Sequence, residues 1–231
     1  MPTLRVIGPG RAGTAMSRAL EAAGWTIAAP IRHGDDVRTA AEGVDLLLIA
    51  TPDVNVAQVA ADVAPVDSTV VAHLAGSLTL DVLAPHARRA SVHPLRSIPT
   101  GDADVRGAWF AVAGDALAER VVDDLGGHRV AIDDANRAVY HAAACIASNH
   151  LVALLGQVER VGATVGVPLA AYLDLVRQTV DNVEALGTRD ALTGPVQRGD
   201  VETVERHRTA IAGDERPAYD AMAELARRLA S

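Results

Sequence analysis

The stretch Leu4–Ser17, LRVIGPGRAGTAMS, decides the fold. An apolar run ends in Gly8, and glycines recur at Gly10 and Gly13, so the spacing GxGxxG stands between a predicted strand and a predicted helix. In dinucleotide-binding folds these glycines allow a tight turn, close approach of the backbone to a pyrophosphate, and packing of helix on strand. A turn without function is the alternative, but the flanking elements are those that binding requires. The predicted cofactor-binding residues of the turn are Gly8, Pro9, Gly10, Arg11, Ala12 and Gly13.

Composition narrows the class of protein. Apolar residues make up 49% of the 231 residues and aromatic residues only 3%, so the core must consist of Ala, Val and Leu. A net charge of −8, with arginines spread along the chain, argues against nucleic-acid binding. The single cysteine, Cys145, excludes an internal disulfide and fits a reducing cytosol. Without a recognisable export signal, and with apolar runs as short as Leu46–Ala50, we expect a cytoplasmic protein that has no membrane segment.

Strands and short helices alternate in the first part of the chain. The continuous apolar run Val44–Ala50 suits a parallel strand that is covered on both faces, so the sequence predicts an α/β fold with a doubly wound sheet. The other expected elements are strands at 25–31, 68–74, 90–92, 108–113 and 129–132 and helices at 36–42, 54–63, 79–86 and 115–125.

From Asp133 the pattern is helical. Asp133 or Asp134 is expected to cap a helix that runs to about Val161, and Pro168 opens another that Gly187 closes. Two further helices follow, at about 200–211 and 217–229. The sequence therefore predicts a sheet domain of residues 1–132 and an all-α domain of residues 133–231.

The identity of the dinucleotide depends on residues just past the second expected strand. Arg32 and His33 stand about twenty residues after the glycine turn, where an arginine favours the 2′-phosphate of NADP(H). The alternative is that Asp35 or Asp36 binds the ribose of NAD. Three further residues complete the predicted cofactor set, although the first two equally suit a simple strand-ending turn: Thr51, Pro52 and His73.

The long helix carries a polar stripe. His141, Cys145 and Asn149 lie four residues apart, and residues at this spacing share a helix face. Buried polar groups need partners, and a substrate or another helix could supply them. His141 and Asn149 are therefore candidate catalytic residues and Ser148 a candidate substrate contact, with internal satisfaction of these groups as the alternative. Cys145 is expected to be a packing residue.

The loop His93–Gly101, HPLRSIPTG, is a second candidate. It follows a short strand, and its prolines can hold the imidazole of His93 over a cleft, where histidine is a natural acid or base. Arg96 could grip a substrate carboxylate and Ser97 could assist; a structural turn is the alternative. Thr193 lies in a glycine-rich segment between two predicted helices, and no metal-ligand spacing occurs in the chain.

Seven segments together resemble a known family. They are IGPGRAGTAMSRAL, IATPD, HLAGS, SVHPLRS, GAWFAVAGD, YHAAACIASNHL and LTGPVQRGDVETVERH. The family comprises two-domain bacterial proteins with a Rossmann-like domain followed by a helical domain of unknown function. It is similar to the 6-phosphogluconate dehydrogenase-like enzymes, which include ketopantoate reductases. The resemblance implies NADP(H)-dependent hydride transfer to a small carboxylate-bearing 2-keto acid and a homodimer formed through the helical domain.

One departure from the related enzymes bears on the reaction. Those enzymes use a helix lysine as acid or base, whereas this helix contains none, and His141 takes that place if Asn149 matches one of their asparagines. Together with the residues of the loop, this comparison predicts His141 as proton donor, Asn149 and Thr193 as orienting residues, and Arg96 as carboxylate ligand. An imine or prephenate-type reductase centred on His93 and a non-catalytic dinucleotide sensor remain alternatives, and the deazaflavin coenzyme remains an alternative to NADP(H).

Overall fold

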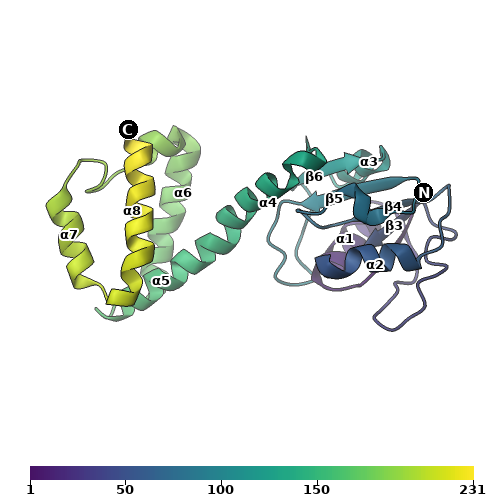
Figure 1. Cartoon of the computed structure of the whole chain (residues 1–231), viewed down its shortest axis with the longest axis horizontal. Helices are drawn as coiled ribbons and strands as arrows, with labels where there is room; N and C mark the ends of the chain where they lie inside the picture. The colour runs from purple at the N-terminus through teal and green to yellow at the C-terminus, as the bar shows by residue number, and fades with distance from the viewer. The chain divides into compact units, whose positions relative to one another are not determined.

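The computed structural model describes residues 1–231, and their contacts divide the chain into two compact units, Met1–Ala147 and Ser148–Ser231 (Figure 1). The sequence placed the division after residue 132. It falls later because the side chain of Arg137 is completely buried and Tyr140 hydrogen-bonds to His93 of the sheet.

The first unit contains one seven-stranded sheet in the order β2-β1-β3-β4-β5-β6-β7. Strands β1 to β5 pair in parallel, β6 pairs antiparallel with β5, and β7 pairs parallel with β6. The carboxyl ends of β1, β3, β4 and β5 therefore meet at one edge, where α/β sheets bind ligands. The strands are β1 Thr3–Ile7, β2 Thr26–Ile27, β3 Leu46–Ile49, β4 Val70–His73, β5 Arg89–Pro94, β6 Trp109–Gly114 and β7 His128–Ala131.

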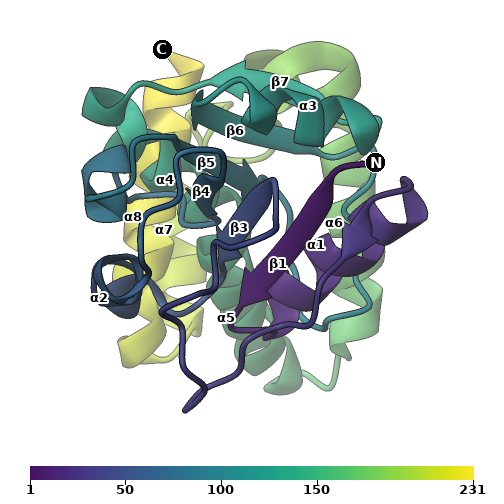
Figure 2. The ribbon, with the colours of Figure 1, turned by 90° about the vertical axis from the view of Figure 1, so that its right-hand side faces the viewer.

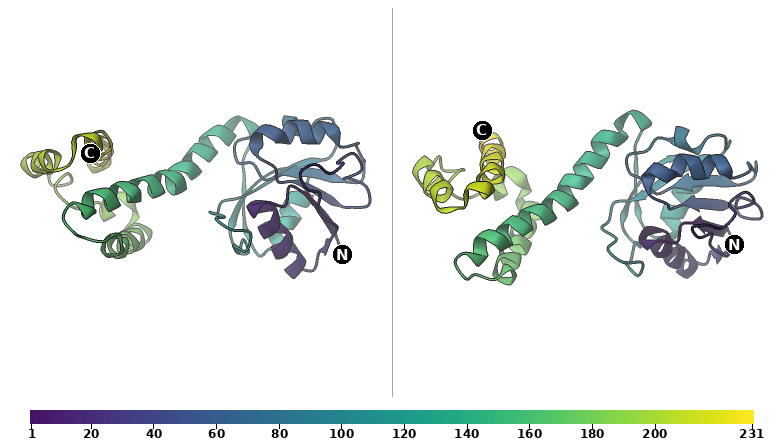
Figure 3. Two further views of the ribbon diagram at one scale, coloured as in Figure 1. Left: turned by 90° about the horizontal axis from the view of Figure 1, so that it is seen from below. Right: turned by 60° about the horizontal axis from the view of Figure 1, so that its bottom comes forward.

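Helices cover both faces of the sheet, which confirms the predicted doubly wound class (Figures 2 and 3). Helices α1 (Arg11–Ala22) and α3 (Leu117–Asp124) pack in one apolar cluster. Helix α2 (Asp53–Asp62) and the 3₁₀ helix η1 (Leu80–Leu83) pack in the other. Every residue of β3 is buried, as its continuous apolar sequence predicts.

Two expected helices differ from the structure. Residues 36–42 form turns, because the Asp36 carboxylate accepts the backbone N–H of Arg38 at 2.9 Å, a local bond that competes with helix formation. The helix expected at 79–86 is reduced to the short η1, and Pro85 follows directly after its last turn.

The second strand is also shorter than expected. Only Thr26–Ile27 pairs continuously, since Pro30 lacks the N–H that a ladder needs, and Ile31 returns to the sheet through an isolated bridge to Ile7.

The predicted long helix is a series of helical segments. They are the 3₁₀ turn η2 (Asp134–Asn136), α4 (Arg137–Cys145), the π turn η3 (Ile146–His150) and α5 (Leu151–Ala163). The expected cap is wrong, because Asp133 makes no side-chain capping bond. Asp134 instead accepts the backbone N–H of Leu80 at 3.1 Å and Nε of Arg137 at 3.2 Å.

The second unit is helical, as predicted. After the α5 segment it contains α6 (Leu169–Ala191), α7 (Val201–Ala210) and α8 (Arg216–Ala230). Gly187 interrupts α6 with a φ of 80°, close to the expected helix end. Asp200 caps α7 by accepting the Thr203 N–H at 3.0 Å.

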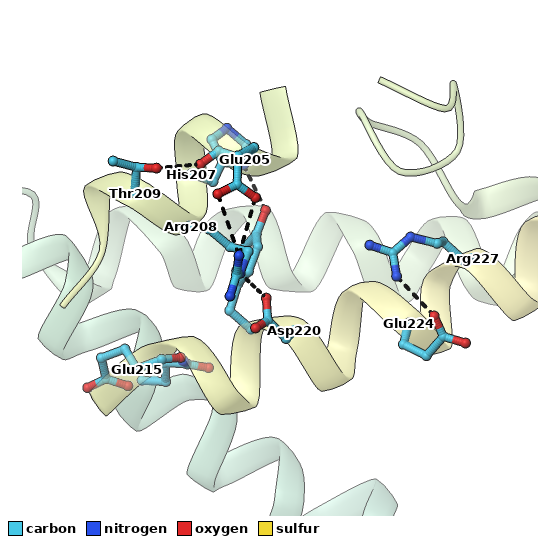
Figure 4. A network of polar contacts seen from close by, with 10 residues as sticks. Glu205, His207, Arg208, Thr209, Glu215, Asp220, Glu224 and Arg227 are labelled. Atoms are coloured by element: carbon cyan, nitrogen blue, oxygen red, sulfur yellow. Dashed lines mark hydrogen bonds and ion pairs between the residues drawn. The ribbon is translucent and has the colours of Figure 1, made fainter. Parts of the chain in front are cut away.

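Charged side chains join α7 to α8. Arg208 pairs with Glu205 of its own helix at 3.3 Å and with Asp220 of α8 at 2.8 Å (Figure 4). His207 of α7 and the Tyr219 hydroxyl of α8 lie 2.9 Å apart and strengthen the same junction.

One helical stretch meets the length and composition of a membrane span. Residues Asp134–Ala163 have a mean hydropathy of 1.4 in their most apolar window, none of which is buried. The expectation of no membrane segment was based on the longest uninterrupted apolar runs, and this stretch contains polar residues between its apolar ones. Length and composition do not distinguish a bilayer from a protein partner for such a helix.

Candidate functional site

The glycine turn has the geometry of a phosphate cradle. Gly8 has a φ of 81°, a conformation that glycine adopts freely, and the N–H of Gly10 bonds to its carbonyl at 2.7 Å. A Cβ at Gly13 would lie 2.8 Å from the Gly8 oxygen and 2.9 Å from Cγ1 of Val6. Gly13 thus permits close packing of α1 on β1, and the helix presents its N-terminus to the turn.

A groove of about 700 Å³ adjoins this turn. It runs along the carboxyl ends of β1 and β3, and Thr51 lines it with a buried hydroxyl that has no hydrogen-bond partner. Of the predicted cofactor residues, the groove is lined by Gly8, Pro9, Gly10, Arg32, His33, Thr51 and Pro52. Arg11 and Ala12 lie in the first turn of α1.

The groove brings cationic and acidic candidates together. Arg32, His33 and Asp35 are all exposed at its rim. The Asp35 carboxylate accepts the backbone N–H of Arg32 at 2.7 Å, and the Asp36 carboxylate is engaged with Arg38. Both acids are therefore bound to the local backbone, whereas Arg32, which also lines the groove, forms no ion pair.

A second group of polar side chains lies at the carboxyl ends of β4 and β5. This group, named here the histidine–arginine cluster, unites residues from two strands and from α4. His93 hydrogen-bonds through Nδ1 to the Tyr140 hydroxyl at 2.7 Å, and its ring centre lies 5.8 Å from that of His141. The members of the cluster are His73, His93, Arg137, Tyr140 and His141.

The two strand histidines of the cluster are neutral at pH 7. Burial lowers the pKa of His73 to about 4, with a further contribution from the charge of Arg137. Burial likewise lowers the pKa of His93 to about 4, and His141 and Arg137 reinforce the effect. Burial also raises the pKa of Tyr140, so its hydroxyl keeps its proton. The neutral His93 and the Tyr140 hydroxyl therefore share a hydrogen bond, and neither group carries a positive charge.

Gly76 allows the cluster to close. It is buried in the turn after β4, and a Cβ at this position would lie 3.0 Å from Nε2 of His93 and in closer conflict with Nδ1 of His141. Nδ1 of His141 is itself buried and has no hydrogen-bond partner, while Nε2 lies 3.6 Å from Sγ of Cys145. A side chain at position 76 would separate the two imidazoles from the sheet edge.

The remaining predicted site residues lie outside the cluster. Arg96 and Ser97 are exposed in the loop after β5, without a hydrogen bond of their own. Ser148 and Asn149 belong to the π turn, where hydrogen bonds span five residues. The four-residue spacing that aligned Asn149 with Cys145 does not hold in such a turn. Thr193 is an exposed residue of the second unit.

Sequence reasoning missed two members of the cluster. Tyr140 directly precedes the predicted His141, and Arg137 lies one helical turn earlier, so the helical spacing that selected His141 and Cys145 could have found Arg137. Nothing in the sequence alone showed that either side chain meets the strand ends.

Comparisons with known proteins place this geometry in a wider group. The family model described as a domain of unknown function (DUF2520) matches residues 110–226, just over half of the chain. No curated protein matches the sequence.

Solved structures with the same fold cover nearly the whole chain. A Bacteroides fragilis protein described as a candidate NADP oxidoreductase is 16% identical with a TM-score of 0.80, and the match covers 98% of each chain. A Thermotoga maritima protein is 23% identical with a TM-score of 0.76, again over 98% of each chain. The pyrroline carboxylate reductase of Plasmodium falciparum, solved with NADP bound, is 13% identical with a TM-score of 0.65 over 100% of this chain and 98% of that one. At these identities the similarity shows the fold of NADP-dependent oxidoreductases.

Proposed function

The chain belongs to the family described as a domain of unknown function, DUF2520, and on this premise we propose that it is an NADP(H)-dependent reductase of a small carboxylate-bearing 2-keto acid. The observation that carries the proposal is the order of features along one sheet edge. The phosphate cradle and groove lie at β1 and β3, and the histidine–arginine cluster follows at the neighbouring strands β4 and β5.

The residues of the groove fit a dinucleotide phosphate. The turn from Gly8 to Gly13 leaves room for the backbone to approach the pyrophosphate. Arg32 can pair with a 2′-phosphate through a charge-assisted fork, and His33 can add a donor. When bound there, NADPH would supply a hydride. If NAD(H) bound through Asp35 or Asp36, the carboxylate would have to give up its hydrogen bond to the backbone N–H and accept one from the ribose hydroxyl instead.

The cluster supports a proton donor beside the cofactor site. When a hydride adds to a carbonyl carbon, the carbonyl oxygen takes up negative charge and needs a proton. His93 is neutral and holds Tyr140, so we assign proton donation to His141, whose Nδ1 is free of other bonds. The expected product is a 2-hydroxy acid, and ketopantoate is the first substrate to test.

The remaining predicted site residues are assigned to substrate contacts. We propose that Asn149, Ser148 and Thr193 orient the substrate, and that Arg96 and Ser97 contact it from the exposed loop after β5.

Imine reduction is a second candidate function. The hydrogen bond between His93 and the Tyr140 hydroxyl favours it. A protonated imine already carries its proton, so hydride addition gives the neutral amine, and the pair needs only to hydrogen-bond the substrate nitrogen. If NADPH binds and neither His93→Ala nor His141→Ala alters turnover, both enzyme hypotheses lose their assigned residues. NADPH binding without turnover of any substrate would favour a non-catalytic dinucleotide sensor.

We propose a homodimer formed through the helical unit. Among its apolar residues only Val204 and Ala223 are buried, whereas large apolar side chains of α6 and α8 are exposed. A second copy of the chain would supply the apolar surface that this unit lacks. The exposed apolar residues of these two helices are Leu175, Val180, Val183, Leu186, Met222, Leu225 and Leu229. We further propose, on the composition, a cytoplasmic location and no nucleic-acid partner. We also propose no membrane partner, because the apolar stretch Asp134–Ala163 begins with the buried Arg137 and with Tyr140 bonded to His93 of the sheet.

The test is a titration of the purified protein with NADPH and then NADH, followed by the fluorescence of Trp25 and Trp109. NADPH is expected to bind more tightly, and Arg32→Ala should weaken NADPH binding by about tenfold or more while leaving NADH binding nearly unchanged. Arg38→Ala, which removes an exposed arginine outside the groove, is the matched control. Absence of binding of either nucleotide would refute the proposal.

A further inference from the structure

Arg137 is the most deeply buried charge of the protein. Its side chain has no solvent exposure, although it begins helix α4. Asp134 contacts only Nε, at 3.2 Å, and that carboxylate also serves the backbone N–H of Leu80. Both Nη atoms are buried and have no hydrogen-bond partner. Two of the three guanidinium nitrogens therefore lack the partners that a buried charge requires.

The surroundings of the two Nη atoms offer no compensating anion. Arg137 lies close enough to His73 and His93 for its charge to lower the pKa of both imidazoles. Both histidines are neutral, and Tyr140 retains its proton. The only carboxylate paired with the guanidinium is that of Asp134, on the Nε side. The two Nη atoms of Arg137 are therefore surrounded by neutral side chains, and the nearby carboxylate of Asp134 is engaged on the Nε side.

We infer that Arg137 binds the carboxylate of the substrate at the carboxyl ends of β4 and β5. A guanidinium with two free nitrogens matches a carboxylate through two parallel hydrogen bonds. His73, whose ring nitrogens make no hydrogen bond of normal geometry, and the unpartnered buried hydroxyl of Ser91 can complete the polar lining. This inference rests on the proposed function, because only a reductase would have this carboxylate as part of its substrate.

This assignment replaces Arg96 as the principal carboxylate ligand. Arg96 is exposed, so water already solvates its guanidinium and a new hydrogen bond there adds little. The side chain of Arg137 is buried and its two Nη atoms have no protein hydrogen-bond partner, so a carboxylate there would satisfy both donors.

Paired probes of nearly equal shape test the inference. Oxamate carries a carboxylate and mimics a 2-keto acid, whereas oxamide is neutral. Both are titrated by calorimetry against wild type, Arg137→Met, Arg137→Lys, Arg96→Met and the exposed control Arg177→Met, without nucleotide. Wild type and Arg177→Met should bind oxamate about tenfold or more tightly than oxamide. Arg137→Met should lose this preference, and Arg137→Lys should keep only part of it, because an ammonium cannot form the two parallel bonds.

Two outcomes overturn the inference. One is a wild-type protein without preference for oxamate, and the other is a preference that survives in Arg137→Met and disappears in Arg96→Met. Melting temperatures separate binding from folding. Arg137→Met and Arg137→Lys differ in their effect on the ion pair with Asp134, so each variant is titrated well below its own melting temperature, where it is folded. If Arg137→Met does not fold, the weakened oxamate binding of folded Arg137→Lys decides the matter.

A separate NADPH titration distinguishes this inference from the proposed function. Arg137→Met should bind NADPH as wild type does, since Arg137 does not line the groove. If wild type prefers oxamate but does not bind NADPH, the proposed reductase function is refuted and the carboxylate site is retained.

Discussion

Acidification should destabilise the sheet unit through His73. This histidine is fully buried and its pKa falls from 6.5 to about 4 on folding, so the folded chain holds it neutral while the unfolded chain protonates it. The stability that the neutral form supplies is complete above pH 6.5 and is lost as the pH falls towards 4. Between about pH 7.5 and about pH 5 the expected loss from this one residue is about 2 kcal/mol.

The His73→Leu variant isolates this contribution. The ring nitrogens make no hydrogen bond of normal geometry, although the backbone at Thr79 and Ala75 lies near them, so leucine removes the titration and only these weak contacts. Urea unfolding followed by tryptophan fluorescence reports on the sheet unit, because Trp25 and Trp109 both lie there. Wild type should lose about 2 kcal/mol more than His73→Leu over this pH range. The exposed His33, replaced by Gln, controls for removing a histidine.

Equal losses of stability in wild type and His73→Leu would refute the reasoning. They would mean that the folded protein accepts a proton at His73, which the neighbouring Arg137 and the buried site oppose.

Three further variants test separate features. Gly13→Ala should lower the free energy of unfolding by about 1–3 kcal/mol, because the new Cβ conflicts with the Gly8 oxygen. In Gly10→Ala the Cβ meets that oxygen only at 4.0 Å, so this variant should weaken NADPH binding without the loss of stability. Urea unfolding and nucleotide titration distinguish the two variants, and equal destabilisation would contradict the packing argument. Val180→Glu should convert the proposed dimer to a monomer in light scattering, and a dimer that persists would place the interface elsewhere. His141→Ala should reduce kcat for a 2-keto acid by about 100-fold or more, and His93→Ala should reduce it less; the reverse order would favour the imine reading.

Local chemistry made most of the sheet unit predictable. The glycine turn and the apolar strand β3 depend on neighbours in sequence, so periodicity and glycine spacing were sufficient. The failed helix at 36–42 depends on the side chain of Asp36 bonding to the backbone, a competition that composition does not reveal. Pro30 limited β2 in the same local way, and its effect was readable in the sequence.

The histidine–arginine cluster could be predicted only in part. His73, His93 and His141 were candidates because each follows a strand or shares a helix face, but their convergence depends on tertiary packing of residues far apart in the chain. Arg137 was missed because a buried arginine is rare and its sequence context resembles an exposed helix start. The π turn that interrupts the stripe before Asn149 also has no sequence signal that we recognise.

The chain contains no lysine and a single thiol, and that thiol lies beside the cluster. Cys145 is half-buried, with Sγ 3.6 Å from Nε2 of His141. A maleimide or iodoacetamide label will therefore attach at one chemically unique place, and amine-directed reagents will leave the side chains untouched. The rate at which Cys145 is alkylated therefore reports how accessible this region is in the wild-type protein. Chemical labelling, which in most proteins requires cysteines to be removed and reintroduced, can here begin without engineering.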